Sequence, residues 1–76
     1  MKMPQKTKYE HIHFEKTPRG KGVYYIRLNK GYFIVGMVEY YKPWKKYATE
    51  HFRGFVFDEN CHRDIADFLD QLNDKL

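Results

Sequence analysis

The sequence predicts an α+β domain, in which a curved antiparallel sheet of four strands is followed by one amphipathic C-terminal helix. Segments rich in β-branched and aromatic residues, separated by glycine and proline, extend to about residue 57. After residue 58 the apolar residues recur with helical spacing instead. The chain has 76 residues, enough for one small domain. We place that domain at residues 9–76, behind a flexible basic arm at residues 1–8.

Two strands and a turn are expected before residue 29. Residues 9–15 form a short strand, and residues 17–22 form a turn in which two glycines can adopt positive φ. Residues 23–28 form a second strand because they are rich in β-branched and aromatic side chains. Alternation gives this strand two faces, with Tyr24, Ile26 and Leu28 on one and Val23, Tyr25 and Arg27 on the other.

A hairpin leads into the third strand. Asn29-Lys30-Gly31 is a tight-turn sequence because Asn and Gly tolerate left-handed backbone geometry. The return strand, residues 32–41, is apolar on both faces and needs cover from a partner subunit or a ligand. Its two rows are Phe33, Val35 and Met37, and Tyr32, Ile34, Gly36 and Val38. Gly36, among bulky neighbours, indicates a bend or a close backbone approach.

The remaining chain is predicted to form a loop, a strand and a helix. Residues 42–47 form a basic, aromatic loop, and the final strand runs through residues 51–57. Asp58 is the expected helix N-cap, with Glu59 in the first turn where its charge suits the helix dipole. One apolar stripe then follows helical spacing: Cys61, Ile65, Phe68, Leu69 and Leu72.

Positive charge and aromatic rings are concentrated in the β half of the chain. Residues 1–57 carry twelve Lys and Arg against four acids, whereas residues 58–76 carry two against six. Thirteen of the fourteen aromatic residues also precede residue 58. Cations neutralise phosphates and flat rings stack on bases. The β half is therefore expected to bind single-stranded nucleic acid, although aromatic residues also simply favour strands.

Several residues combine a cation with a neighbouring ring. Tyr25 and Arg27 share one strand face, and Lys30 lies at a hairpin tip from which it can reach a phosphate. Trp44 lies among lysines on the predicted loop, where it can stack on a base. The alternatives are a subunit contact for Tyr25, a solvated turn for Lys30, and burial of Trp44.

Three short segments carry a likeness to a known family. They are Asn29-Lys30-Gly31-Tyr32, Val38-Glu39-Tyr40-Tyr41 and Arg53-Gly54-Phe55. In order and spacing, residues 20–76 resemble the single-stranded-DNA-binding domain of the transcriptional coactivator PC4 family. That family has Phe-Lys-Gly-Lys, Arg-Glu-Tyr-Trp and a Lys-Gly step at these places. The resemblance implies four curved strands, one helix, a homodimer, and a role in transcription or replication.

The resemblance also implies ligand contacts for Arg27, Lys30 and Tyr41, with Arg53 as a basic partner. Three departures remove two charges and one ring from the family's surface: Asn29 for Phe, Tyr32 for Lys and Val38 for Arg. Tyr32 and Trp44 are candidates to compensate. The complete predicted nucleic-acid-binding set is Lys21, Tyr25, Arg27, Lys30, Tyr32, Tyr41, Trp44, Lys45, Lys46 and Arg53.

No enzymatic activity, cofactor or metal is expected. The chain has no serine, and we find no nucleophile beside a base, no paired carboxylates and no glycine-rich phosphate loop. Four residues could ligate a metal, namely His11, His13, Cys61 and His62. Their spacing is not that of structural zinc sites, and Cys61 is expected to be a buried thiol. A ribonuclease is a further alternative, with His11, His13, Lys21 and Arg27 as its candidate residues.

The expected setting is intracellular, cytoplasmic or nuclear. A lone cysteine excludes an internal disulfide, the first residues lack a signal-peptide core, and no apolar run approaches a membrane span. Because so small a core is marginal, we expect a homodimer. The expected ligand is single-stranded DNA or RNA, with neither a membrane nor a small-molecule substrate. The alternative is a protein-interaction module, such as a viral or regulatory inhibitor, that uses the acidic helix face or the row from Ile34 to Val38.

Overall fold

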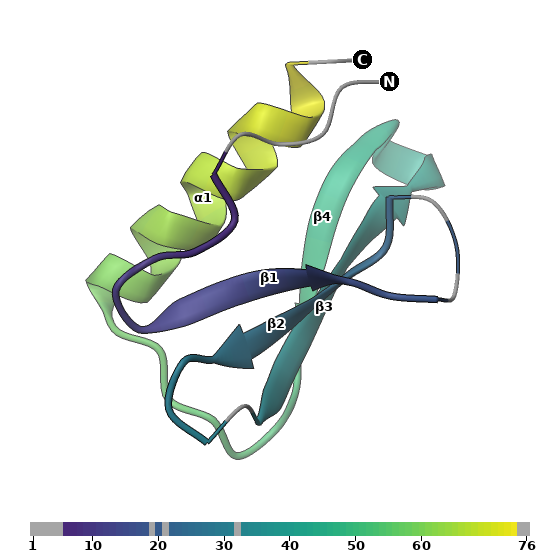
Figure 1. Ribbon diagram of the computed structural model, residues 1–76. Helices are drawn as coiled ribbons and strands as arrows, with labels where there is room; N and C mark the ends of the chain where they lie inside the picture. The colour runs from purple at the N-terminus through teal and green to yellow at the C-terminus, as the bar shows by residue number, and fades with distance from the viewer. Residues whose placement is uncertain (1–5, 19, 21, 32, 75–76) are drawn as a thin grey trace.

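The computed structural model describes residues 6–18, 20, 22–31 and 33–74. The elements, in chain order, are β1 (Ile12–Lys16), β2 (Tyr24–Leu28), β3 (Ile34–Tyr41), the short 3-10 helix η1 (Lys42–Trp44), β4 (Lys46–His51) and α1 (Glu59–Asn73). The four strands form one sheet in the order β1-β2-β3-β4, and every neighbouring pair is antiparallel (Figure 1). The predicted α+β class, with a four-stranded antiparallel sheet followed by one helix, is confirmed.

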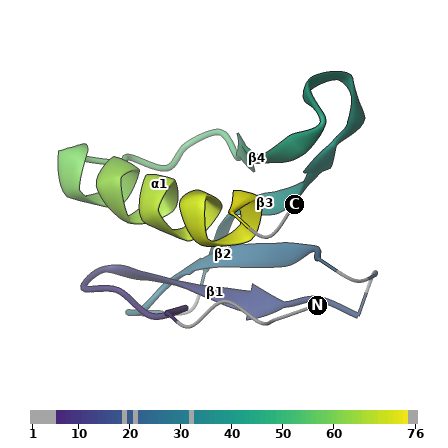
Figure 2. The same cartoon turned by 90° about the horizontal axis from the view of Figure 1, so that it is seen from above.

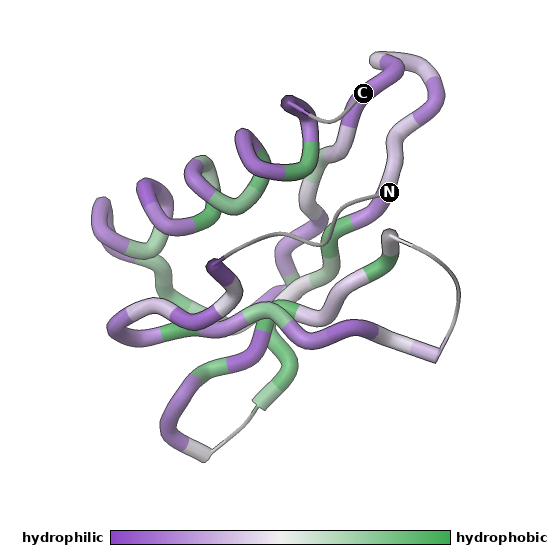
Figure 3. The backbone as a smooth tube through the Cα atoms, turned by 45° about the horizontal axis from the view of Figure 1, so that its top comes forward, coloured by the Kyte–Doolittle hydropathy of each residue, from purple (hydrophilic) through white to green (hydrophobic). Residues whose placement is uncertain are grey.

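Helix α1 covers one face of the sheet (Figure 2). Its hydrophobic residues lie on the side that faces the strands (Figure 3). Phe68, at the centre of the stripe, is fully buried; its ring stacks on Phe14 at 3.9 Å and meets Tyr24 edge-on at 5.1 Å. Burying a side chain of this size stabilises the fold by about 1.5–3 kcal/mol. The stripe predicted from helical spacing is confirmed, with Cys61, Ile65, Phe68 and Leu72 buried and Leu69 partly so.

A β-bulge changes which side chains of β3 reach the core. Ile26 pairs with Gly36, but the next residue of β2, Arg27, pairs with Ile34, so Val35 is an extra residue in β3. Val35 and Val38 are consequently both fully buried in the core shared with α1. The two predicted alternating rows are therefore wrong, since one residue from each is in the same core. Helix α1 covers this apolar surface.

Gly36 lies where β3 passes close to the backbone of β4. A Cβ atom at this position would lie 2.6 Å from the carbonyl oxygen of Glu50 and 3.1 Å from Cδ1 of Ile26. Neither a backbone carbonyl nor a packed core side chain can move away cheaply. The close backbone approach predicted for this glycine is confirmed.

The final strand begins earlier than predicted. Lys45 adopts the left-handed conformation, with φ 54° and ψ 41°, and its amide donates to the Lys42 carbonyl at 3.1 Å. This turn pairs Lys46 with Tyr41, so β4 covers Lys46–His51. The prediction of a strand over residues 51–57 is wrong. Residues 52–58, which we name the connection, lie outside the strands and lead from the end of β4 to the first turn of α1.

Both ends of α1 are fixed by side chains. The Asp58 carboxylate accepts a hydrogen bond from the Cys61 amide at 2.9 Å, which confirms the predicted N-cap. At the other end, Asn73 Oδ1 accepts from the Tyr47 amide at 2.7 Å, and Asn73 Nδ2 donates to the Tyr47 carbonyl at 3.3 Å. The C-terminal turn of α1 therefore rests on the beginning of β4.

The described part of the predicted arm is attached to the domain. The Lys6 amide donates to Gln71 Oε1 at 2.9 Å, and the Thr7 carbonyl accepts from the Phe14 amide at 2.8 Å. Lys8 forms an isolated antiparallel bridge with His13. Residues 6–8 thus extend the pairing at the edge of β1.

Candidate nucleic-acid interface

The predicted binding residues do not form one cluster. Tyr25 and Arg27 lie on β2, Lys30 lies in the β2–β3 hairpin, and Arg53 lies in the connection. The remaining described members, Tyr41, Trp44, Lys45 and Lys46, lie at the β3–β4 hairpin. The two hairpins are at opposite ends of β3, whose eight residues span roughly 24 Å. Lys21 and Tyr32 lie outside the described residues.

Arg27 is engaged within the sheet. Its Nε donates to Glu15 Oε1 at 2.9 Å, and its guanidinium carbon lies 5.5 Å from the centre of the Tyr25 ring. Much of its positive charge is therefore compensated before any phosphate approaches. The predicted pairing of Tyr25 with Arg27 on one strand face is present, but a carboxylate accompanies it.

The sheet face opposite α1, which we name the outer face, carries three carboxylates. One row of cross-strand partners runs Glu15, Tyr25, Met37 and Glu50 across all four strands. Glu39, two residues along β3 from Met37, lies on the same face and pairs with Ala48. The centre of the outer face therefore repels phosphate, and the phosphates of a bound strand would have to lie elsewhere.

The β3–β4 hairpin combines exposed rings with unopposed positive charge. We name residues 41–46 the basic hairpin: Tyr41, Lys42, Pro43, Trp44, Lys45 and Lys46. Its three lysines are exposed, and it contains no acid. Trp44 is 65% exposed, so the alternative of a buried Trp44 is wrong. Its ring lies edge-on to Tyr41 at 4.9 Å, which places two accessible aromatic surfaces next to the cations.

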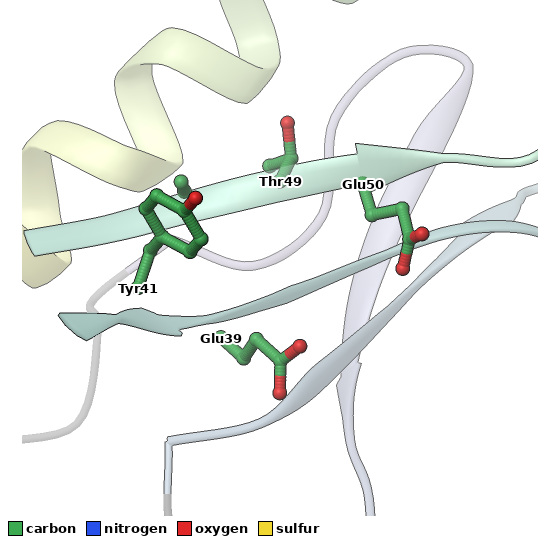
Figure 4. A pocket seen from close by; sticks show the side chains of 5 residues that line it. Glu39, Tyr41, Thr49 and Glu50 are labelled. Atoms are coloured by element: carbon green, nitrogen blue, oxygen red, sulfur yellow. The ribbon is translucent and has the colours of Figure 1, made fainter. Parts of the chain in front are cut away.

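A hollow on the outer face begins at the basic hairpin. It has a volume of about 320 Å³ and is lined by Glu39, Tyr41, Ala48, Thr49 and Glu50. Figure 4 shows the Tyr41 ring at one end and the two carboxylates toward the other. Sequence reasoning missed the hollow because it placed the last strand too late. With β4 placed correctly, strand alternation alone would bring Glu39, Ala48 and Glu50 to one face.

Asn29 and His13 form a second polar cluster, at the edge of the sheet. Asn29 Nδ2 donates to the carbonyls of Tyr9 at 2.7 Å and Glu10 at 3.0 Å. Its Oδ1 is therefore the acceptor, and the Nδ1 atom of His13, 2.7 Å away, carries the hydrogen. This pair fixes the turn before β1. Within the described part of the chain, no three His, Cys, Asp or Glu residues gather as a metal site.

Burial shifts the pKa values of two groups near the start of α1. Burial raises the pKa of the Cys61 thiol, which keeps it protonated. Burial and the neighbouring His62 lower the pKa of His51, whose ring centre lies 6.1 Å from that of His62. Both shifts favour the neutral form of the group. They belong to the packing of the helix start against β4 and supply no charge for a ligand.

No family model, no curated protein and no solved structure matches this chain. The fold defines the class, an α+β domain with an open antiparallel sheet and one covering helix, and the resemblance to the PC4 family stays a prediction. No helix in the described ranges is both long enough and apolar enough to cross a bilayer.

Proposed function

We propose that this protein binds single-stranded nucleic acid through the basic hairpin. The contacts made by the rings and lysines of the hairpin depend little on the base sequence of the bound strand. The observation that carries the proposal is the 65% exposed Trp44 ring, beside Tyr41 and flanked by three exposed lysines with no acid among them. Each base stacked on such a ring contributes about 1–3 kcal/mol. Each phosphate neutralised by a lysine releases counterions and adds further affinity. A role in transcription or replication suits such binding.

The surroundings of the basic hairpin support this choice over the rest of the surface. Glu15 of β1 compensates Arg27 of β2 at 2.9 Å, and Glu39 and Glu50 also lie on the outer face. The exposed side of α1 carries Asp67, Asp70 and Asp74. An extended polyanion is therefore attracted to the end of the sheet that bears the hairpin.

The test is a fluorescence titration of a mixed-sequence single-stranded oligonucleotide and of its duplex, from low to moderate salt. We expect tighter binding of the single strand, with affinity that falls steeply with salt. Replacing Lys42, Lys45 and Lys46 together by Gln should flatten the logarithmic salt dependence by about 2, since each contact to a single strand contributes about 0.7.

The matched control removes the same charge from the opposite end of the sheet. It replaces three exposed residues, Lys8, Lys30 and Arg53, by Gln. Lys30 and Arg53 belong to the binding set predicted from the sequence. The control should keep most of the affinity. Equal losses in the two triple variants would place the site elsewhere, and single-strand binding no better than duplex binding would reject the proposal.

A second candidate function, a protein-interaction module, is favoured by the connection. Phe52, Phe55 and Val56 are exposed there, Val56 by 93%. We propose that the predicted homodimer also forms through this segment, because α1 of the same chain already covers the apolar surface of β3. Protein purified without bound nucleic acid, judged by its 260/280 nm absorbance ratio, would favour the interaction module.

A further inference from the structure

The hollow beside the basic hairpin results from a size difference between cross-strand partners. On the outer face, Tyr41 pairs with Lys46 and Glu39 pairs with Ala48, while Glu50 lies two residues beyond Ala48. Ala48 contributes one methyl group where its neighbours have long side chains. The result is the depression of about 320 Å³ that Ala48 helps to line. Its volume is at the lower end of the range of small-molecule pockets.

The walls of the hollow specify a flat ligand that carries N–H donors. The Tyr41 ring supplies an aromatic surface, and it is the same ring that contacts Trp44 at 4.9 Å. Glu39 and Glu50 supply only acceptors when ionised. No described cation forms a salt bridge with either carboxylate. A ligand that stacks on Tyr41 and donates hydrogen bonds to the two carboxylates therefore suits the hollow.

We propose that the hollow is a base-recognition site that takes an amino-bearing nucleobase in preference to thymine or uracil. The inference rests on the proposed function, because the lysines of the basic hairpin would hold the phosphates next to the hollow. Cytosine, adenine and guanine each present an exocyclic amino group that can donate to Glu39 or Glu50, as carboxylates accept from the amino group of cytosine. Thymine and uracil present only carbonyl oxygens and a ring N–H at the corresponding edge. A carbonyl oxygen facing a carboxylate is repelled.

Two pyrimidine homopolymers test this preference at constant ring size. The experiment titrates fluorescent 12-mers of deoxycytidine and thymidine at the same neutral pH and salt concentration. We expect the cytidine strand to bind at least about fivefold more tightly, the lower limit for a good base contact. Measuring a ratio removes the general electrostatic effect of any charge change, since both strands carry the same phosphates.

Three variants assign the preference to the hollow. Glu39→Gln with Glu50→Gln should bring the ratio close to one, because a carboxamide accepts and donates equally well. Ala48→Leu should do the same without any change of charge, by filling the hollow. Glu15→Gln is the control, since it removes a carboxylate of the same face outside the hollow, and it should keep the wild-type ratio. Circular dichroism confirms that each variant is folded.

The outcomes separate this inference from the proposal on which it rests. Tight but equal binding of the two homopolymers overturns the inference and leaves the proposed function intact, whereas binding of neither overturns both. A cytidine preference that survives in Ala48→Leu and in the double glutamine variant places base recognition elsewhere and overturns the inference. Binding of a lysine-rich peptide that is lost in Ala48→Leu, without any base preference, would assign the hollow to a protein partner instead.

Discussion

Asn29 fixes its turn through side-chain hydrogen bonds and not through the left-handed backbone geometry expected from the sequence. It was predicted as a residue tolerant of left-handed geometry, but in the described ranges Lys45 is the non-glycine residue with positive φ. Asn29 acts through its side-chain amide, which joins the β2–β3 hairpin to the Tyr9 and Glu10 carbonyls before β1 and to His13 in β1. The position of the turn was predictable, and the long-range contacts were not.

Replacing Asn29 by Ala should lower the free energy of unfolding by about 1–3 kcal/mol. The change removes the hydrogen bonds that Asn29 makes to the Tyr9 and Glu10 carbonyls and to His13 Nδ1, and the loss of such bonds carries this cost. Urea denaturation measures the difference. Lys30→Ala, in the same turn but exposed, is the control and should change stability little. Similar stability in the two variants would contradict this account.

Replacing Trp44 by Ala should weaken single-strand binding by about 1–3 kcal/mol, the contribution of one stacked base. The ring is 65% exposed, so its removal should leave the thermal midpoint nearly unchanged. Titration and thermal unfolding on the same preparation separate the two effects. Trp44→Phe keeps a flat ring and should retain most of the affinity. A loss of stability with unchanged affinity would mean that Trp44 is structural.

At the scale of the element, α1 is fixed by features that are close together in the sequence and can be recognised there. Its cap, Asp58, and its stripe from Cys61 to Leu72 are separated by one or a few helical turns. The strands depend more on partners. The first three were predicted with bounds within three residues of those observed, but β4 was not. Its start requires a left-handed Lys45, a conformation that few residues other than glycine adopt.

The Asp58 cap should make helix stability depend on pH in the acid range. The hydrogen bond from the Cys61 amide lowers the pKa of Asp58 below its ordinary value of 3.8. The folded state therefore favours the ionised carboxylate, whose contribution is complete above pH 3.8 and is lost as the pH falls through the lowered pKa. Asp58→Asn keeps a capping acceptor but does not titrate.

The thermal midpoints of wild type and Asp58→Asn, measured from pH 7 to pH 2, test this dependence. The wild type should be the more stable at neutral pH, because its charge also interacts favourably with the helix dipole. The difference should shrink toward pH 2. A difference that stays constant over the whole range would show that ionisation of Asp58 does not contribute.

On the scale of the whole molecule, acidic and basic side chains occupy separate regions of the surface. These regions combine residues from different elements, so they cannot be recognised in any one segment of the sequence. Acidic side chains occupy the exposed side of α1 and the centre of the outer face, and the basic hairpin is at one end of the sheet. The connection is at the other end, where the Phe52 amide donates to the Val35 carbonyl at 2.9 Å. The proposed ligand and the proposed second subunit therefore use opposite ends of the molecule.

Light scattering over a range of protein concentrations should detect a dimer that dissociates when Val56 is replaced by Asp. Val56 is 93% exposed, so the substitution should not disturb the monomer, but it places a charge in the proposed apolar contact. Ala66→Asp adds the same charge at an exposed position on α1 and should leave the dimer intact. A monomer at all concentrations in the wild type would refute the homodimer.

The sequence was enough to predict the features that depend on near neighbours: the helix with its cap and stripe, the order of strands and helix, the hairpin at Asn29 and the close approach at Gly36. It also indicated Trp44 and the lysines around it, because they are adjacent in the chain. Four features became visible in the folded chain alone: the bulge at Val35, the pairing of Arg27 with Glu15, the start of β4, and the hollow lined by Ala48. Each of these depends on strand register, which is set by contacts between residues far apart in the chain, and a shift of one residue moves a side chain to the other face of the sheet.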